Sequence, residues 1–409
     1  MKIPSIRFSS FNGDWQTSSL SNFAQKITTK NKNFEVKNVV SNSAVHGLIS
    51  QRDFFDKDIA NSANIDGYYV IKKGDFVYNP RISKESPYGP VNLYKFDEKG
   101  VVSPLYLCFQ VDGINRDFLS YYFKSNNWHR HIYRNGDQGA RHDRVSIKDR
   151  EFFKMPISYP TQEEQKKISN FFFLLDQRIS HQRKKVETLR EQKKGLLQKI
   201  FSQELRFKDE DGKEFPKWIR KKLSELGFFK KSYSYSRSVE GKGNYRHLHY
   251  GDIHSKYDGI LNNISFPTIN VDGPHETIEN GDLIFADASE DYKDLGKCVV
   301  IEDTGDQRII SGLHTHRFSA HDSVDPRFIM YFTKTKAYKS FIKRVGNGIS
   351  VLGISKKSLE DLELDLPSLN EQRKIVDVLS TLDLKIAKEE EKHEALQVQK
   401  KGFMQQLFV

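Results

Sequence analysis

The chain has 409 residues, a formal net charge of +11 at pH 7, 37% hydrophobic residues and 12% aromatic residues. This length exceeds one ordinary domain and suits two or three, and the apolar fraction is sufficient for packed cores, which excludes wholesale disorder. The positive charge favours a polyanionic partner, either nucleic acid or an anionic membrane surface.

Membrane and disulfide classes of protein are not expected. The densest apolar run, Phe171 to Leu175, is far shorter than the roughly 20 residues that span a bilayer. The chain starts without an apolar stretch of signal-peptide length, and its two cysteines, Cys108 and Cys298, stand alone. We therefore expect a cytoplasmic protein with no bound metal.

The first globular segment has the pattern of a mixed α and β fold. β-branched and aromatic runs next to turn residues predict strands at Val36–Val40, Tyr68–Ile71, Phe76–Tyr78 and Val101–Phe109. Phe118–Phe123 has the pattern of a short helix. The loop after one strand carries Asn79 and Arg81, which are candidates for contact with nucleic acid.

The segment 128–144 is rich in arginine, amide, aromatic and glycine residues and is expected to be a loop. Arginine suits bidentate contact with guanine, and asparagine suits adenine. The candidates for such contacts are Arg130, Arg134, Asn135, Arg141, His142 and Arg144. The alternative is a solvated polar loop.

A long helix is predicted from residue 161 to residue 201. Pro160 and a capping box formed by Thr161 and Glu164 mark its start. Steps of four and three residues select a heptad seam, which buries one helix face against another helix. The seam residues assigned to this helix are Ile168, Phe172, Leu175, Ile179 and Leu189. The alternative is that the helix packs on its own globule.

The second half of the chain repeats this order. A strand is expected at Leu283–Phe285 and a short helix at Phe328–Phe332. Lys336, Lys339 and Lys343 have near-helical spacing and suit phosphates, which position a protein on DNA without specifying sequence. Further candidates for nucleic-acid contact are Arg344, Asn347, Ser350 and Ser289. The seam residues of a second long helix are Ile375, Leu379, Leu382, Ile386 and Leu396.

The two halves are an internal repeat. A shift of 207 positions aligns 160–201 with 367–408 without a gap, and 17 of the 42 positions are identical. About two or three identities would occur by chance. Glycine and aspartate at 74–75 match 281–282, whereas the residues between such anchors differ almost completely. We therefore expect two globules that share a scaffold and differ in their contents.

The sequence contains no convincing catalytic motif. A phosphate-binding glycine loop is missing, and so is the Asn-Pro-Pro-aromatic or similar tetrapeptide of a DNA methyltransferase, the nearest approach being Asn79-Pro80-Arg81. Asp287 with Asp291-Tyr-Lys293 faintly resembles a metal-dependent nuclease pattern. Histidines alternate at 129/131, 247/249 and 314/316 without a third ligand at a suitable spacing.

The repeat, the two Pro-x-x-x-Glu-Gln helix starts at Pro160 and Pro367, the Gly-Asp strands and the paired Arg-Phe…Trp…Leu openings resemble the specificity subunit of type I restriction–modification systems. The resemblance covers essentially all residues. It implies an α+β protein with two target-recognition domains, at 1–158 and 204–365. Two long spacer helices, at 159–203 and 366–409, would form an antiparallel coiled coil.

The same resemblance implies a non-catalytic subunit that recognises an asymmetric, bipartite target in double-stranded DNA. Two modification subunits and the restriction subunits would join it. S-adenosylmethionine, Mg²⁺ and ATP would bind those partners and not this chain. Two alternatives remain open from the residues: a metal-dependent restriction endonuclease, and a structural coiled-coil adaptor.

Overall fold

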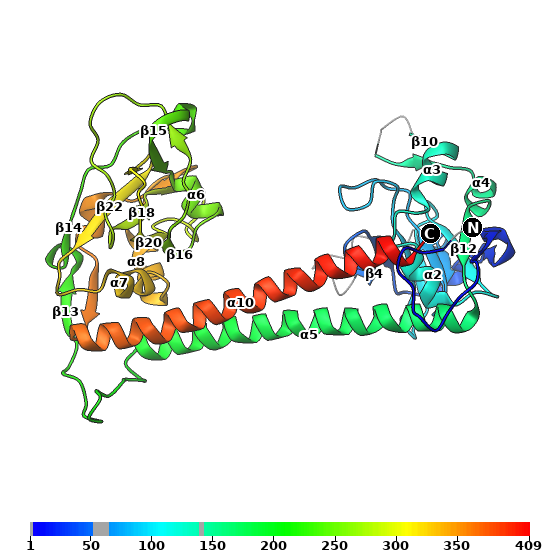
Figure 1. The fold of residues 1–409 in the computed structure, drawn as a ribbon, viewed down its shortest axis with the longest axis horizontal. Helices are drawn as coiled ribbons and strands as arrows, with labels where there is room; N and C mark the ends of the chain where they lie inside the picture. The colour runs from blue at the N-terminus through cyan, green and yellow to red at the C-terminus, as the bar shows by residue number, and fades with distance from the viewer. Residues whose placement is uncertain (1–2, 52–64, 139–142) are drawn as a thin grey trace. The chain divides into compact units, whose positions relative to one another are not determined.

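The computed structural model describes residues 3–51, 65–138 and 143–409. The chain divides into two compact units: unit 1 contains Met1–Lys184 and Glu390–Val409, and unit 2 contains Lys185–Glu389. Two long helices, α5 (Gln162–Phe201) and α10 (Leu369–Leu407), each continue from one unit into the other (Figure 1).

Unit 1 is built around a four-stranded antiparallel sheet in the order β2 (Ala24–Lys26), β9 (Leu107–Val111), β6 (Phe76–Tyr78) and β7 (Val91–Leu93). Phe76 and Phe109 are fully buried on adjacent strands, and their rings stack with centroids 5.3 Å apart. The core therefore lies between this sheet and the helices that cover it.

Shorter elements complete unit 1. The additional strand pairs are β1 (Gln16–Ser19) with β12 (Pro156–Tyr159), β3 (Val40–Ser43) with β4 (Gly47–Ser50), β5 (Tyr69–Ile71) with β8 (Gly100–Val102), and β10 (Asp137–Gln138) with β11 (Val145–Ser146). The helices are α2 (Arg116–Tyr122), α3 (His129–Asn135) and α4 (Asp149–Phe153), with 3-10 turns at Leu20–Asn22 and Lys32–Phe34.

Unit 2 repeats the central sheet of unit 1 and adds one strand to it. Its order is β14 (Gly227–Phe229), β22 (Thr315–Ala320), β18 (Leu283–Ala286), β20 (Cys298–Asp303) and β16 (Gly259–Asn262). The first four strands follow the order of β2, β9, β6 and β7, whereas β16 runs parallel to β20 at one edge.

The remaining elements of unit 2 frame this sheet. The strands are β13 (Ile219–Lys222) paired with β24 (Glu363–Leu366), β15 (Glu240–Leu248) between β17 (Thr268–Ile269) and β21 (Ile309–Ser311), and β19 (Ala288–Ser289) paired with β23 (Leu352–Gly353). The helices are α6 (Tyr250–Ser255), α7 (Pro326–Phe332), α8 (Lys336–Val345) and α9 (Lys356–Glu360), with 3-10 turns at Leu223–Glu225 and Arg237–Val239.

The predicted strands are confirmed in type but not in every boundary. The strand expected at Val36–Val40 begins only at Val40. The apolar run Val101–Phe109 divides into β8 and β9, because a turn intervenes in which Tyr106 N donates to Ser103 O at 3.0 Å. Apolar composition alone does not reveal such a turn.

The predicted capping boxes are half correct. Glu164 N and Glu371 N each lie 3.4 Å from the hydroxyl of the expected cap, Thr161 or Ser368. Both carboxylates bind elsewhere: Glu164 pairs with an arginine near the start of the chain, and Glu371 pairs with Arg206. The helix start therefore serves to attach the globule, because the carboxylate is more strongly satisfied by a guanidinium than by one backbone N–H.

The two long helices pair antiparallel within each unit. In unit 1, Lys400 contacts Asp176, and the rings of Phe171 and Phe403 lie 5.2 Å apart. In unit 2, Lys185 Nζ lies 2.6 Å from Glu389 Oε1. As residue numbers rise along α5, those of its contacts on α10 fall. The two helices therefore form the antiparallel coiled coil that the heptads predict (Figure 1).

The predicted seam is mostly buried. Ile179 and Leu382 are half-buried, whereas the buried seam residues are Ile168, Phe172, Leu175, Leu189, Ile375, Leu379, Ile386 and Leu396. The first turns of both helices also join the core of a globule, with Phe172 in that of unit 1 and Leu379 in that of unit 2. Packing on a globule and pairing of helices, treated above as alternatives, therefore occur together.

Candidate nucleic-acid interface

The basic segment of unit 1 is more ordered than the predicted loop. Residues 129–135 form helix α3, which ends where Gly136 N donates to Ile132 O at 2.8 Å. Arg130, Arg134 and Asn135 are exposed on this helix, although the Asn135 amide also donates to His131 O at 2.8 Å. Strand β10 follows directly and pairs antiparallel with β11, so these exposed polar side chains come from a helix next to a pair of short strands.

Two of the predicted arginines, far apart in the sequence, lie next to each other in the structure. Arg81 and Arg144 form an isolated antiparallel bridge, and both are exposed. They line a hollow of about 350 Å³ together with small polar side chains such as Ser41 and Ser103. The carboxylate next to Arg144, that of Asp143, lies 3.9 Å from its guanidinium, too far for a hydrogen bond. This hollow therefore presents donors and positive charge.

Asn79 has an internal role that argues against contact with a base. Its amide donates to Asn42 O at 3.0 Å, and its side-chain oxygen accepts from Arg81 N at 3.0 Å. Asn42 in turn donates to Val77 O and accepts from Asn92. The side chain of Asn79 is buried, so its hydrogen-bonding groups hold the loop that carries Arg81 in place of reaching DNA.

In unit 2 the corresponding basic element is helix α8. Lys336, Lys339 and Lys343 are exposed along it, and Arg344 follows in its last turn. The helix ends at Val345 and is capped by Gly346, and a tight loop follows in which Asn347 and Gly353 exchange two backbone hydrogen bonds of 3.0 and 2.7 Å. The loop side chains Asn347 and Ser350 are exposed.

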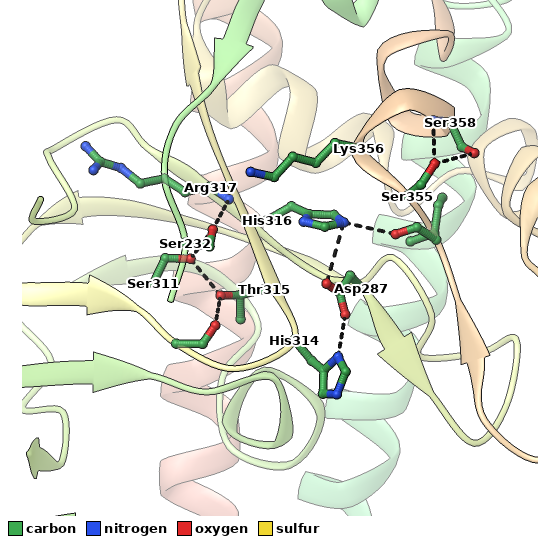
Figure 2. A network of polar contacts seen from close by, with 12 residues as sticks. Ser232, Asp287, Ser311, His314, Thr315, His316, Arg317, Ser355, Lys356 and Ser358 are labelled. Atoms are coloured by element: carbon green, nitrogen blue, oxygen red, sulfur yellow. Dashed lines mark hydrogen bonds and ion pairs between the residues drawn. The ribbon is translucent and has the colours of Figure 1, made fainter. Parts of the chain in front are cut away.

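A network of histidine and aspartate anchors this loop (Figure 2). The Asp287 carboxylate lies between two imidazoles: His314 Nδ1 donates to Oδ1 at 3.0 Å, and His316 Nε2 lies 3.5 Å from Oδ2. His316 also donates to Ile354 O at 2.9 Å. Desolvation lowers the pKa of His316, so this imidazole is neutral at pH 7. His316 and the backbone of Asp287, whose carbonyl accepts from Ile354 N at 2.9 Å, therefore hold the residue that follows the loop.

Ser289 is buried, which argues against its predicted contact with a base. It lies on β19, and its hydroxyl accepts from Asp291 N at 3.2 Å. Asp291, part of the faint nuclease pattern, accepts from the backbone of Lys293 and Asp294. Among the described residues, no group of three or more histidine, cysteine, aspartate or glutamate side chains is arranged to hold a metal ion.

Arg141 and His142 lie outside the described residues. The other candidates that stay exposed in unit 1 are Arg81, Arg130, Arg134, Asn135 and Arg144. Those in unit 2 are Lys336, Lys339, Lys343, Arg344, Asn347 and Ser350. In unit 1 they lie on α3 and at the bridge between Arg81 and Arg144, and in unit 2 they lie on α8 and the loop after it; their contact with DNA stays a prediction.

The sequence profile of the type I restriction modification DNA specificity domain matches this chain twice, at residues 12–189 and 217–398. The two matches cover most of the chain and coincide with its repeat. The chain belongs to this family.

Two curated relatives come from Methanocaldococcus jannaschii. The putative type I restriction enzyme MjaX specificity subunit is 23% identical over 358 residues, 82% of this chain and 78% of the relative. The type I restriction enzyme MjaVIII specificity subunit is 23% identical over 268 residues, 62% of this chain and 61% of the relative.

Solved structures share the fold over nearly the whole length. The HsdS subunit from Thermoanaerobacter tengcongensis has a TM-score of 0.51 at 16% identity and covers 97% of both chains. The type I restriction–modification S subunit from M. genitalium has a TM-score of 0.55 at 15% identity, covering 100% of this chain and 99% of that one. A chain from a study of the assembly of a type I system has a TM-score of 0.59 at 15% identity, covering 96% and 97%.

Specificity subunits are the non-catalytic DNA-recognition components of type I systems and work with methylase and restriction subunits. The family therefore decides against both alternatives, the endonuclease and the adaptor. Within the described residues, none of the helices combines the length and apolar character needed to cross a bilayer.

The specificity fold also contains a repeated contact that the sequence did not reveal. In unit 1, Tyr121 Oη donates to Asp176 Oδ2 at 2.9 Å, and Lys400 from α10 contacts the same carboxylate. In unit 2, Tyr331 Oη donates to Asp383 Oδ2 at 2.7 Å, and Lys193 contacts that carboxylate from α5. These residues tie a globule to both long helices at once.

A signal for this contact was present in the repeat. The aspartates at 176 and 383 are identical under the 207-residue shift, as are the lysines at 193 and 400. The pairing is crosswise, because each aspartate meets the lysine of the other copy. Identity within the repeat therefore marked the residues, but only the antiparallel geometry shows which of them meet.

Proposed function

We propose that each unit of this specificity subunit reads one half of a bipartite DNA target, with the paired helices fixing the distance between the halves. The observation that carries the proposal is the combination of a repeated scaffold and unlike surfaces. Glu164 and Glu371 bind equivalent arginines, whereas the basic surface of unit 1 is rich in arginine and that of unit 2 in lysine. Unlike surfaces on a common scaffold support an asymmetric target.

The physical advantage of two reading units is multiplied discrimination. A single small domain contacts only a few base pairs, and each mismatch costs about 1–3 kcal/mol. Joining two such domains through a stiff spacer makes the second contact intramolecular. A helix of 40 residues is about 60 Å long. Half-sites on one face of DNA repeat at roughly 34–36 Å, so a spacer of this length is adequate.

The partners and location follow the same proposal. Two modification subunits would dock on the two copies, and restriction subunits would join them. S-adenosylmethionine, Mg²⁺ and ATP belong to those subunits, and the complex acts in the cytoplasm. We expect the modification subunits to methylate adenine, so adenine methylation is the activity through which the specificity of this chain becomes measurable.

The test is single-molecule sequencing of adenine methylation in cells that express the chain with its modification subunits. We expect one asymmetric motif with a gap of unread bases. The variant Arg134→Ala should relax or weaken reading of one half only, and Lys343→Ala should act on the other half. A continuous or palindromic motif, or equal loss at both halves from either variant, would contradict the proposal.

A further inference from the structure

Each unit has a lysine at the same place after a short helix, and only one of these two lysines, Lys334, forms an ion pair among the described residues. Lys334 follows helix α7 in unit 2, and its Nζ lies 2.9 Å from Asp258 Oδ2. Desolvation alone would raise the pKa of Asp258, but the charge and hydrogen bond of Lys334 hold that pKa below its ordinary value. The lysine charge in unit 2 is therefore paired within the chain.

Lys124 occupies the same place after helix α2 in unit 1. Its N–H donates to Tyr121 O at 3.0 Å, as Lys334 N donates to Tyr331 O. Among the residues that the structure describes, however, Lys124 forms no ion pair, and its Nζ lies 4.9 Å from the centroid of the Tyr121 ring. Desolvation, and then the charge of Lys400, lower the pKa of Lys124 to about 8. Lys124 is exposed, and the charges of Asp176 and Asp117 act on it without a direct ion pair, so its ammonium group stays open to a further anionic partner.

A hollow of about 520 Å³ lies beside Lys124. Lys400 and Lys401 of helix α10 also line it, and Asp176 and Glu85 provide its carboxylates. Asp176 is already bound by Lys400 and by the hydroxyl of Tyr121, and Glu85 is exposed. The hollow therefore has an excess of positive charge where the matching region of unit 2 contains Asp258.

This hollow continues toward the candidate nucleic-acid surface. Ala44 and Pro90 line both it and the smaller hollow that contains Arg81 and Arg144. His129, the first residue of α3, lies in the lining as well. Through these shared residues, the hollow lined by Lys124, Lys400 and Lys401 adjoins the one lined by Arg81 and Arg144.

We propose that a backbone phosphate of bound DNA enters this hollow and contacts Lys124 and Lys401, taking the place that Asp258 fills in unit 2. The proposal rests on the proposed function, because it assumes that unit 1 binds a DNA half-site. It adds a phosphate site formed jointly by a recognition globule and a spacer helix. Such a contact would fix how the globule is oriented on the DNA, since phosphate contacts position a protein without reading sequence.

The difference between the copies favours DNA over a protein partner. Two identical modification subunits would be expected to bind features that the two copies share, such as the contacts between tyrosine, aspartate and lysine. Within the described part of the chain, the lysine that follows the short helix lacks an ion pair in unit 1 and has one in unit 2. DNA half-sites differ between the copies, so a contact restricted to unit 1 fits DNA better than a duplicated protein partner.

The test compares Lys124→Gln with the matched control Lys334→Gln in the full chain bound to its modification subunits. The affinity of each complex is measured across a range of KCl concentrations, with a DNA duplex that contains the motif identified by methylation sequencing. Loss of one phosphate contact should reduce the slope of log K against log salt by about one, and weaken binding about eightfold near 0.1 M salt. Lys124→Arg should retain the slope, and Lys334→Gln should leave it unchanged.

A second measurement locates the phosphate. Neutral methylphosphonate groups are placed one at a time beside each half-site. One position beside the half-site read by unit 1 should weaken binding of the parent complex and have no further effect in Lys124→Gln. An unchanged salt slope in Lys124→Gln, an equal loss in Lys334→Gln, or weakened subunit assembly with a normal slope would each overturn the proposal. A gapped motif that persists with these results would leave the proposed function intact.

Discussion

At the scale of single residues, the buried carboxylates at the starts of the two long helices explain why the motif is repeated. Each carboxylate binds an arginine of a globule and so attaches that globule to the helix. Glu371 is fully buried and accepts from Arg206 Nη2 at 2.7 Å and from Trp218 Nε1 at 3.1 Å. Arg206 keeps some solvent contact, whereas the carboxylate has none. Loss of the carboxylate charge would therefore leave the partly desolvated guanidinium of Arg206 without its charged partner.

We expect Glu371→Gln to destabilise unit 2 by about 2 kcal/mol, less than for a fully buried pair because Arg206 is partly exposed. The measurement is the midpoint of urea denaturation followed by tryptophan fluorescence. The matched control is Glu363→Gln, whose partner Arg220 is exposed, and it should change stability by less than about 0.5 kcal/mol. Equal effects of the two variants would show that the buried pair contributes no more than a surface pair.

The histidines predict how stability depends on pH. Desolvation is the main reason why the pKa values of four histidines are lowered: His129, His249, His254 and His316. These side chains stay neutral in the folded protein at a pH where the unfolded chain, with an ordinary pKa near 6.5, already takes up protons. Their contribution to stability is therefore complete above about pH 6.5 and is lost as the pH falls toward the folded values.

We expect the free energy of unfolding to decrease between pH 7.5 and about pH 5.5, a range in which ordinary carboxylates stay ionised. Urea denaturation at each pH checks the sign. The decrease should become shallower in His254→Gln, because that variant removes one of the groups responsible. A free energy of unfolding that is constant or rises toward pH 5.5 would contradict this assignment.

At the scale of elements, the heptad seam is the feature that local sequence determines best. Leu396 of α10 is buried in the seam, whereas Val398, two residues further, is 71% exposed. Periodicity predicts this difference because residues two positions apart point to different sides of a helix. The same reasoning correctly assigned both long helices, and the short helices expected at 118–123 and 328–332 are also present.

The variant Leu396→Ala should destabilise unit 1 by about 2–4 kcal/mol, through lost burial and a cavity between the paired helices. Val398→Ala, on the exposed side, should change stability by less than about 0.5 kcal/mol. Thermal unfolding followed by circular dichroism at 222 nm compares the two. Similar melting temperatures for both variants would mean that the helices do not depend on each other at this position.

Other features depend on contacts between distant residues, and the sequence pattern did not predict them. Asn79 lies in a polar loop that suits DNA contact, but its partner Asn42 is supplied by a strand 37 positions earlier. The contact of Lys400 with Asp176 joins residues 224 positions apart. Helix α3 was expected as loop because its seven residues carry mostly polar side chains, and only Ile132 is buried.

At the scale of the whole molecule, the duplication gives both units the same contact between a globule and the end of a long helix. In unit 2, Leu205 N donates to Lys199 O at 3.0 Å where α5 runs into the second globule. In unit 1, Ile6 N makes the matching contact with Gln406 O at 3.3 Å, although these residues lie near opposite ends of the chain. The first globule thus contacts the end of α10 as the second contacts the end of α5.

The proposed spacer role makes a prediction that concerns the molecule as a whole. Lys185 pairs with Glu389, so the junctions 184/185 and 389/390 lie opposite each other in the antiparallel helices. One heptad inserted at both junctions preserves the seam and lengthens the pair by about 10 Å, equivalent to roughly three base pairs. We expect methylation of the original target to be lost, and any new target to keep both half-sites with a longer gap.

Sequencing of adenine methylation compares this double insertion with two controls. A heptad inserted in one helix alone should unfold or weaken the chain, because seam residues beyond the insertion lose their partners. The stability of the double insertion should stay close to that of the parent chain, so loss of methylation cannot be attributed to unfolding. If the stable double insertion still methylated the original motif with its original gap, the distance between half-sites would not be set by the paired helices.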